Sequence, residues 1–303
     1  MISVLSKGKK VTIQVLIIVF LSSVAVLNIS RIRHSIFESK KSTGEEEQKA
    51  ETFQLAKCNC SRTLFDIEQN RNNSVQFSET TCSWDAFRRG SNQKVAGFSF
   101  YGNTSSSAHK SKKYFEGIKE NLRLVRSMYG ADWSMRLYYD LAQSDELMGH
   151  LCDLACNNNH LDLCYVRELP GNPVKDASDI FAMNWRFLPP LDPQVSVFLC
   201  WDLDSRISAR EVAAVQEWLQ SDKALHSMRD HPYHNIPLLG AAWGARMTEE
   251  KVREKWAKSW QDILQDPESR AGRERKGPDQ TVLARWVWRP WGRQVAMEHD
   301  SYT

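Results

Sequence analysis

The chain has 303 residues, which is enough for one large domain or two small ones with a substantial apolar core. Its formal net charge of +3 is too small to indicate a protein that binds nucleic acid. Its seven cysteines are many for a cytosolic enzyme of this size.

The amino-terminal part predicts a membrane anchor. Three lysines, at positions 7, 9 and 10, precede an uncharged apolar segment, residues 11–29, that is about as long as a bilayer-spanning helix. We therefore expect a cytoplasmic tail at residues 1–10 and a transmembrane signal anchor at residues 11–29. A cleaved signal peptide or a buried helix are the alternatives, but no clean cleavage site follows the apolar segment. Basic residues on both sides leave the orientation to be decided by other features.

Cysteines and glycosylation acceptor triplets favour a luminal location for the rest of the chain. The triplets begin at Asn59, Asn72 and Asn103. We expect disulfides rather than a zinc site, because the cysteines lack the usual paired zinc spacing. Since the number of cysteines is odd, at least one is free or pairs between chains, and Cys200 in an apolar run is the best candidate for a buried free thiol.

The polar composition of residues 30–94 predicts a luminal stem, and residues 95–303 are expected to form the folded domain. In the domain, alternating apolar residues predict strands and helical spacing predicts helices. The expected strands are residues 95–102, 133–140, 161–166 and 195–199, and the expected helices between them are residues 112–128, 145–156 and 177–188. A further helix should begin after Ser208 as its N-cap. This alternation indicates an α/β fold with a mainly parallel sheet.

Two aspartates follow the last of these strands. Asp202 and Asp204 stand two positions apart, so we expect them to project together while Leu203 points into the core. Carboxylates at the carboxyl end of a strand suit a hard divalent cation, Mg²⁺ or Mn²⁺, with positions left for water and diphosphate oxygens. Acidic pairs also end many strands as ordinary solvated caps.

The residues around this pair carry a resemblance to a known family. In chain order they are the apolar strand ending in Asp202-Leu-Asp204, the segment Ser208 to Glu211, the ionisable cluster at residues 226–234, the segment Gly240 to Gly244, and Gly277-Pro-Asp-Gln280. Together they resemble metal-dependent nucleotide-sugar glycosyltransferases of the GT-A type, which have a single Rossmann-like domain. The resemblance covers about the last two thirds of the chain. It implies Mn²⁺ or Mg²⁺ as cofactor, a nucleotide-diphosphate sugar as donor, and a glycan, protein or lipid as acceptor.

The resemblance also implies roles for individual residues. The metal ligands would be Asp202, Asp204 and, late in the chain, His299, while Asp279 and Gln280 would face the acceptor and the anomeric carbon, with Asp279 as general base or charge stabiliser. Residues expected near the donor are Tyr101, Arg186, Arg206, Arg229, Trp243 and Gly244. Asp179 and Arg186 are expected to share one face of the helix at residues 177–188, and residues 226–234 to form a loop beside the ligand.

Two departures from the family pattern are Trp201, where an arginine is common, and Ala241, where a glycine is common. They support an inactive glycan-binding, lectin-like module of the same fold as the alternative function. A phosphatase of the haloacid dehalogenase type also ends a strand in Asp-x-Asp, but it normally does so on its first strand. The expected location is the Golgi or endoplasmic reticulum membrane, as a single-pass type II protein. The sugar, the nucleotide, the stereochemistry and the oligomeric state are not encoded in these patterns.

Overall fold

The computed structural model describes residues 50–65, 74–101, 108–171, 174–231, 234–271 and 277–301. Contacts divide the chain into two units, residues 1–48 and 49–303, and all described residues belong to the second unit. The expected tail, the anchor at residues 11–29 and the first part of the stem therefore lie outside the described residues. Within the described residues, no helix has the length and apolarity needed to cross a bilayer.

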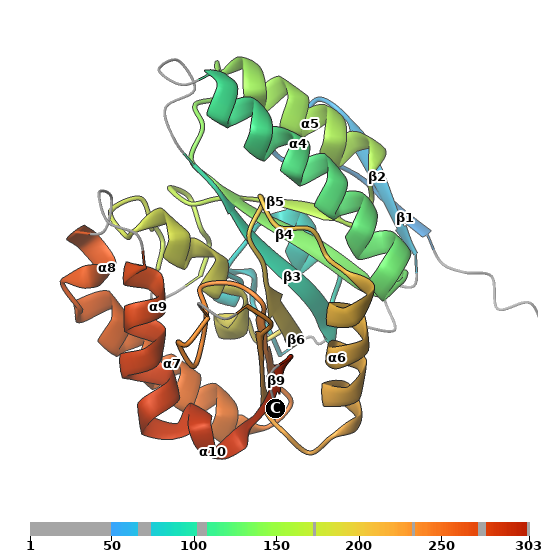
Figure 1. Cartoon of the computed structure of the whole chain (residues 1–303). Coiled ribbons are helices and arrows are strands. Elements are labelled where there is room, and N and C mark those ends of the chain that lie inside the picture. Colours follow the sequence, from blue (N-terminus) through green and yellow to red (C-terminus); the bar gives the residue numbers. More distant parts are fainter. Residues whose placement is uncertain are drawn as a thin grey trace, which may run out of the picture. The chain divides into compact units, whose positions relative to one another are not determined.

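The described elements alternate between strands and helices (Figure 1). The strands are β1 Ala50–Gln54, β2 Ser61–Phe65, β3 Gln93–Phe100, β4 Trp133–Tyr139, β5 Leu161–Tyr165, β6 Val195–Cys200, β7 Leu225–Arg229, β8 Trp243–Arg246 and β9 Ala296–Asp300. The α-helices are α3 Trp84–Phe87, α4 Ala108–Leu124, α5 Glu146–Asn157, α6 Ala209–Gln220, α7 Glu250–Gln265, α8 Glu268–Ala271, α9 Pro278–Leu283 and α10 Arg293–Val295. The 3₁₀ segments are η1 Phe77–Glu79, η3 Ala182–Phe187 and η4 Pro189–Leu191, and the π segments are η2 Val125–Tyr129 and η6 Ala284–Gly292.

Seven strands form one mixed sheet in the order β5-β4-β3-β6-β8-β7-β9. The strands β3, β4, β5 and β6 are mutually parallel, β8 runs antiparallel to both of its neighbours, and β9 is parallel to β7. The α/β fold expected from the sequence is thus confirmed. Its sheet is mixed but mainly parallel, because only the two pairings of β8 are antiparallel. The chain builds outward from β3 to β5 and then returns to place β6 on the other side of β3. In open α/β sheets such a reversal opens a ligand-binding crevice at the carboxyl ends of the two strands.

Helices cover both faces of the sheet, because each parallel crossover carries its helix across one face. One apolar cluster joins the sheet to α4, α5 and α6 through side chains that include Ile118, Leu151 and Trp218. The opposite cluster joins the sheet to η3, α7, α9 and η6 through residues that include Trp256 and Trp260, both without exposed surface. Ser208 caps α6 as expected, and its hydroxyl accepts a hydrogen bond from the backbone of Glu211.

The later part of the expected stem packs on the domain through three disulfides. They join Cys58 to Cys152, Cys60 to Cys156 and Cys82 to Cys164. The expectation of disulfides is confirmed, as is Cys200, which is buried and free. Two of the bridges tie the turn between β1 and β2 to α5, so residues from about 50 onward move with the sheet.

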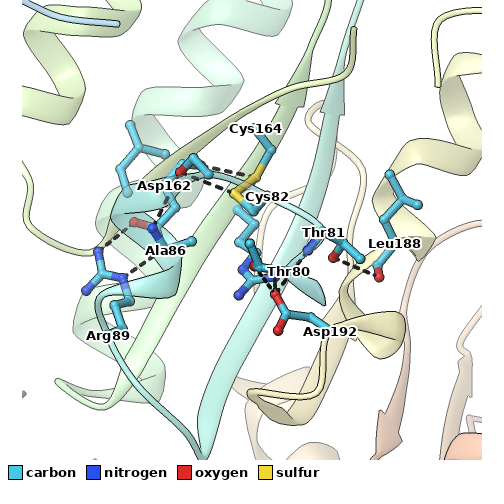
Figure 2. Close-up of a disulfide and its surroundings, with 12 residues drawn as sticks. Thr80, Thr81, Cys82, Ala86, Arg89, Asp162, Cys164, Leu188 and Asp192 are labelled. Carbon is cyan, nitrogen blue, oxygen red and sulfur yellow. Dashed lines mark hydrogen bonds and ion pairs between the residues drawn. A yellow bond between two sulfur atoms is a disulfide. The ribbon is translucent and has the colours of Figure 1, made fainter. Parts of the chain in front are cut away.

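Charged groups reinforce the third bridge, as Figure 2 shows. Asp162 on β5 has no exposed surface. Its Oδ2 pairs with Nε of Arg89 at 2.7 Å and its Oδ1 with Nη1 of Arg62 at 3.1 Å, so two cations balance one buried carboxylate. Nearby, the hydroxyl of Thr80 donates to Asp192 over 2.5 Å. Removal of a native disulfide that closes a loop of this length typically costs about 2–5 kcal/mol.

Two expected elements are wrong. Residues 177–188 do not form an α-helix, because only Ala182–Phe187 is helical, as the 3₁₀ segment η3. The two prolines at positions 189 and 190 lack the amide hydrogens that an α-helix needs and disfavour α geometry in the residue before them. The cluster at residues 226–234 is also not all loop, since its first four residues belong to β7.

Candidate active site

The two aspartates lie on a turn directly after β6. The strand ends at Cys200, and the backbone amide of Trp201 still donates to the carbonyl of Gly97 on β3 over 3.1 Å. Leu203 is buried, whereas the side chains of Asp202 and Asp204 are 32% and 40% exposed. The pair therefore stands at the carboxyl ends of β3 and β6, where the sheet order reverses.

Arg186 on η3 bridges two carboxylates at this position. Its Nη1 pairs with Asp202, and its Nη2 lies 2.8 Å from Oδ2 of Asp279 on α9. The arginine side chain is 2% exposed and that of Asp279 is 3% exposed, so this part of the cluster is almost closed to water. Side chains from η3, from the turn after β6 and from α9 thus form one connected charged group.

The backbone of Arg186 is fixed as firmly as its guanidinium. Its amide donates to the hydroxyl of Ser99 on β3 over 3.1 Å. A Cβ atom on Gly97 would stand 2.8 Å from the carbonyl oxygen of Arg186, which requires glycine at this place in β3. Because η3 presses on β3 in this way, the guanidinium has little freedom to leave the two carboxylates.

Burial and mutual charge set the protonation of the cluster. Burial alone lowers the pKa of Arg186, but the carboxylates of Asp202 and Asp279 outweigh it and raise the pKa above its ordinary value. Burial raises the pKa of Asp279, the guanidinium of Arg186 opposes this shift, and the charge of Asp202 adds to it. Arg186 is therefore permanently charged, and Asp279 holds a proton more readily than an ordinary aspartate.

A segment between β7 and β8 closes the cluster from one side. A Cβ on Gly240 would stand 2.0 Å from Oδ2 of Asp279 and 2.7 Å from Nη2 of Arg186. The carbonyl of Gly240 accepts a hydrogen bond from the thiol of Cys200 over 3.2 Å. Ala242 has a positive φ of 59°, which is uncommon for a residue with a side chain. Gly240 therefore lies directly against the charged side chains of Asp279 and Arg186.

Exposed groups border the cluster on its open side. Tyr101 follows β3 and is 43% exposed, and it lies close enough to Tyr114, Asp202 and Asp279 for their charges to act on its hydroxyl. Lys113 on α4 reaches Asp204 at 3.4 Å. One helical turn further along α4, a Cβ on Gly117 would stand 3.5 Å from Nη1 of Arg206. The rim is therefore aromatic and cationic.

Most of the other residues expected at the site lie away from the charged cluster. Trp243 is buried in the core against Phe198 and Trp256, and Gly244 in β8 packs on the backbone of Phe198. Arg229 pairs with Glu298 on β9. Gln280 is half-buried beside Asp279 in α9. Asp179 does not share a helix face with Arg186; it lies in the turn before η3 and pairs with Arg270.

The described residues do not assemble the expected metal ligands. His299 on β9 hydrogen-bonds His226 at 3.1 Å and Glu217 at 3.4 Å. The strand β9 is three places from β6 in the sheet, and three strand spacings of about 4.8 Å separate them by roughly 14 Å. Among the described residues, no three His, Cys, Asp or Glu side chains are grouped to hold a metal ion. Within the described ranges, the donor set does not fit a resident divalent cation, because Asp202 is paired with the guanidinium of Arg186.

Sequence reasoning missed three residues that shape this site, namely Lys113, Tyr114 and Gly117. It included Gly240 in a motif but did not predict that this glycine forms a wall of the charged cluster. Tyr114 carries a signal that could have been used, because it is an aromatic residue on the polar side of an amphipathic helix. The contacts of both glycines depend on tertiary structure and leave no local pattern.

Comparison with known proteins gives a faint structural likeness. No family model and no curated protein sequence matches the chain. Among solved structures 26 chains match, and one is the crystal structure of residues 1–349 of S. aureus TarS, a glycosyltransferase. That match has a TM-score of 0.38 and 9% sequence identity, and it covers 64% of this chain and 55% of the TarS chain. The chain thus spans about half of that structure. A likeness at this level carries no argument about chemistry, so the function is argued from the site.

Proposed function

We propose that the chain transfers a sugar from a nucleotide-diphosphate donor to a glycan, protein or lipid acceptor. The observation that carries this proposal is the bridge from Arg186 to Asp202 and Asp279, placed at the reversal point of the sheet with an exposed tyrosine beside it. A carboxylate near the anomeric carbon stabilises the positive charge that develops there, and positive charge near the diphosphate stabilises the departing nucleotide. The motif resemblance in the sequence supports the same chemistry.

Asp202 and Asp279 would have different roles, because one is partly exposed and the other is enclosed. Asp202 is about one third exposed, so it can hydrogen-bond sugar hydroxyls and face the positive charge that develops at the anomeric carbon. Asp279 is enclosed, and we propose that it acts through Arg186, which it holds in place against Asp202. Its raised pKa also fits a carboxyl group that gains a proton during the reaction.

The rim would bind the nucleotide. Tyr101 and Tyr114 offer exposed rings, and aromatic faces of this kind stack on a nucleobase or on the apolar face of a sugar. Lys113 and Arg206 border the turn that carries Asp204, where their charges can meet those of a diphosphate. The donor would then lie across the carboxyl ends of β3 and β6.

We further propose that this domain faces the lumen of the Golgi apparatus or endoplasmic reticulum, with residues 11–29 as the anchor. Three disulfides support an oxidising compartment, since such bonds are rare in the cytosol. Asn59, in the turn between β1 and β2, is exposed and therefore accessible for glycosylation. Glycosidase treatment of the full chain should shift its mobility. An unchanged mobility, together with a carboxyl end that protease reaches in intact vesicles, would contradict this topology.

The proposal is tested by incubating the purified full chain with a panel of nucleotide-diphosphate sugars and following both thermal stabilisation and nucleotide release. We expect one donor to stabilise the protein and to be consumed, faster when a glycan acceptor is present. A donor that stabilises without being consumed would favour the glycan-binding module. Absence of stabilisation by every donor would contradict a nucleotide-sugar site.

A further inference from the structure

The cation position beside Asp202 is occupied by a side chain of the protein. The Nη1 group of Arg186 pairs with Oδ1 of Asp202, and Nη2 of the same group pairs with Asp279. One permanent positive charge therefore lies where a divalent cation would have to bind the first aspartate of the pair. A metal ion at Asp202 would stand next to this guanidinium and be repelled by it.

Packing prevents Arg186 from moving aside. Its backbone is fixed to β3 by the hydroxyl of Ser99 and by the close contact at Gly97. Gly240 lies directly against its guanidinium, because a Cβ atom added to this glycine would overlap Nη2 of Arg186. Any move would also leave Asp279 as an unpaired carboxylate in a place almost closed to water, which is a costly arrangement.

The other side chains expected at the metal site each have a partner in the protein. Asp204 faces Lys113 at 3.4 Å, and His299 hydrogen-bonds both His226 and Glu217. Magnesium and manganese ions take about six ligands, of which a protein that binds a phosphate substrate usually gives one or two carboxylates while water and phosphate oxygens give the rest. In the described parts of the chain, no group of three suitable side chains is present.

The charge of a diphosphate can be met without a metal. Lys113 is 60% exposed and lies on α4 one turn before Gly117, which in turn lies against Arg206. Lys113 reaches the turn after β6 from α4, Arg206 follows that turn, and Arg186 supplies a third positive charge at Asp202. Lys113 and Arg206 at the rim, with Arg186 at Asp202, supply part of the charge neutralisation that a divalent ion gives.

We infer that Arg186 takes the place of the divalent cation, so that this site binds nucleoside diphosphates without Mn²⁺ or Mg²⁺. The inference rests on the proposed function, because it concerns the same donor site. It assigns Asp202 to the orientation of Arg186 and not to the coordination of a metal.

The test measures binding of uridine and guanosine diphosphate to the full chain by calorimetry, in EDTA and in Mn²⁺. We expect the dissociation constant of the diphosphate that binds to differ by less than about threefold between the two conditions. Asp202→Asn should keep this binding in EDTA or tighten it by up to about tenfold, because the variant removes a negative charge near an anionic ligand. The exposed Asp222→Asn is the matched control and should leave the affinity unchanged.

A second measurement reports the metal alone. The paramagnetic resonance signal of free Mn²⁺ should not fall when the protein is added without nucleotide. A stoichiometric loss of that signal that disappears in Asp202→Asn would overturn the inference. Binding of a diphosphate only with Mn²⁺, abolished by Asp202→Asn, would also overturn it while supporting the proposed function. Failure of both diphosphates to bind under either condition would overturn the proposed function and this inference with it.

Discussion

Nη2 of Arg186 lies 2.8 Å from Oδ2 of Asp279, and both side chains are almost completely enclosed. An ion pair in such a place stabilises the fold only as a unit, because either partner alone would be a buried charge without compensation. The pair also couples α9, near the carboxyl end of the chain, to η3 and β6 in the middle. The geometry of the candidate site therefore depends on segments more than 90 residues apart.

Substitution of Arg186 should weaken both the fold and the site. Arg186→Gln leaves two carboxylates without their cation, so we expect a loss of about 3–5 kcal/mol in the free energy of unfolding and loss of nucleoside diphosphate binding. Arg186→Lys keeps the charge but cannot bridge both carboxylates, and should bind more weakly than the wild type. Denaturant unfolding and calorimetry measure the two effects. Wild-type binding by a folded Arg186→Gln protein would remove Arg186 from the site.

A second prediction uses two glycines as a matched pair. The added methyl group of Gly240→Ala would overlap Asp279 and Arg186, so transfer should fall by about tenfold or more and stability by about 1–3 kcal/mol. Gly149→Ala lies on α5 with no atom within 4 Å of the new carbon, so it should raise the free energy of unfolding by about 0.5–1 kcal/mol. Equal effects of the two substitutions on transfer would show that the wall at Gly240 is unimportant.

The sequence was sufficient for much of the fold because the relevant signals are local. Apolar alternation located β3, β4, β5 and β6 within about two residues, and the excess of cysteines indicated disulfides. Such patterns arise from burial of one strand face or from redox conditions, and both are visible without the tertiary structure. They could not define the pairing of the cysteines, because a bridge such as Cys82–Cys164 joins residues 82 positions apart.

The candidate site was only partly accessible to sequence reasoning. Asp202 and Asp279 were predicted as site residues from their motifs. The bridge between them depends on Arg186, which lies on a 3₁₀ segment that was expected to be an α-helix. His299 illustrates the opposite case. A histidine near the end of the chain suggested a metal ligand, whereas the pairing of β9 with β7 brings it to His226.

The thiol content gives a direct check on the cysteines. All seven lie in the described part of the chain, six in bridges and Cys200 buried. A thiol reagent should therefore find almost none in the native protein, one per chain after unfolding without reductant, and seven after reduction. Cys200→Ala should remove the single thiol seen without reductant. Three or more thiols in unreduced protein would contradict the bridges.

Acid should destabilise the protein through His226. Burial, together with the neighbouring His299, lowers the pKa of His226 to about 3. The unfolded chain takes up a proton near pH 6.5 while the folded protein does not, so stability is lost as the pH falls through this region. Between pH 7.5 and pH 5 the loss should be about 2 kcal/mol. His226→Gln should remove this part of the slope, and the exposed His150→Gln should retain it, when unfolding is measured at each pH.

Asp279→Asn separates a role in chemistry from a role in helix capping. Asp279 lies in the first turn of α9, where the loss of its charge from the helix end is worth roughly 0.3–1 kcal/mol. If the carboxylate instead takes up a proton during the reaction, transfer should slow by about 10²–10⁴-fold while donor affinity changes little. Burial raises the pKa of Asp279, so the folded protein binds this proton more tightly than the unfolded chain, and stability falls as the pH rises above about 3.8. The variant should lack this pH dependence.

Asp145→Asn, at the N-cap of α5, is the matched control for helix capping and should leave transfer unchanged. Full activity in Asp279→Asn with a slightly lower melting temperature would show that the residue is only a helix-start aspartate.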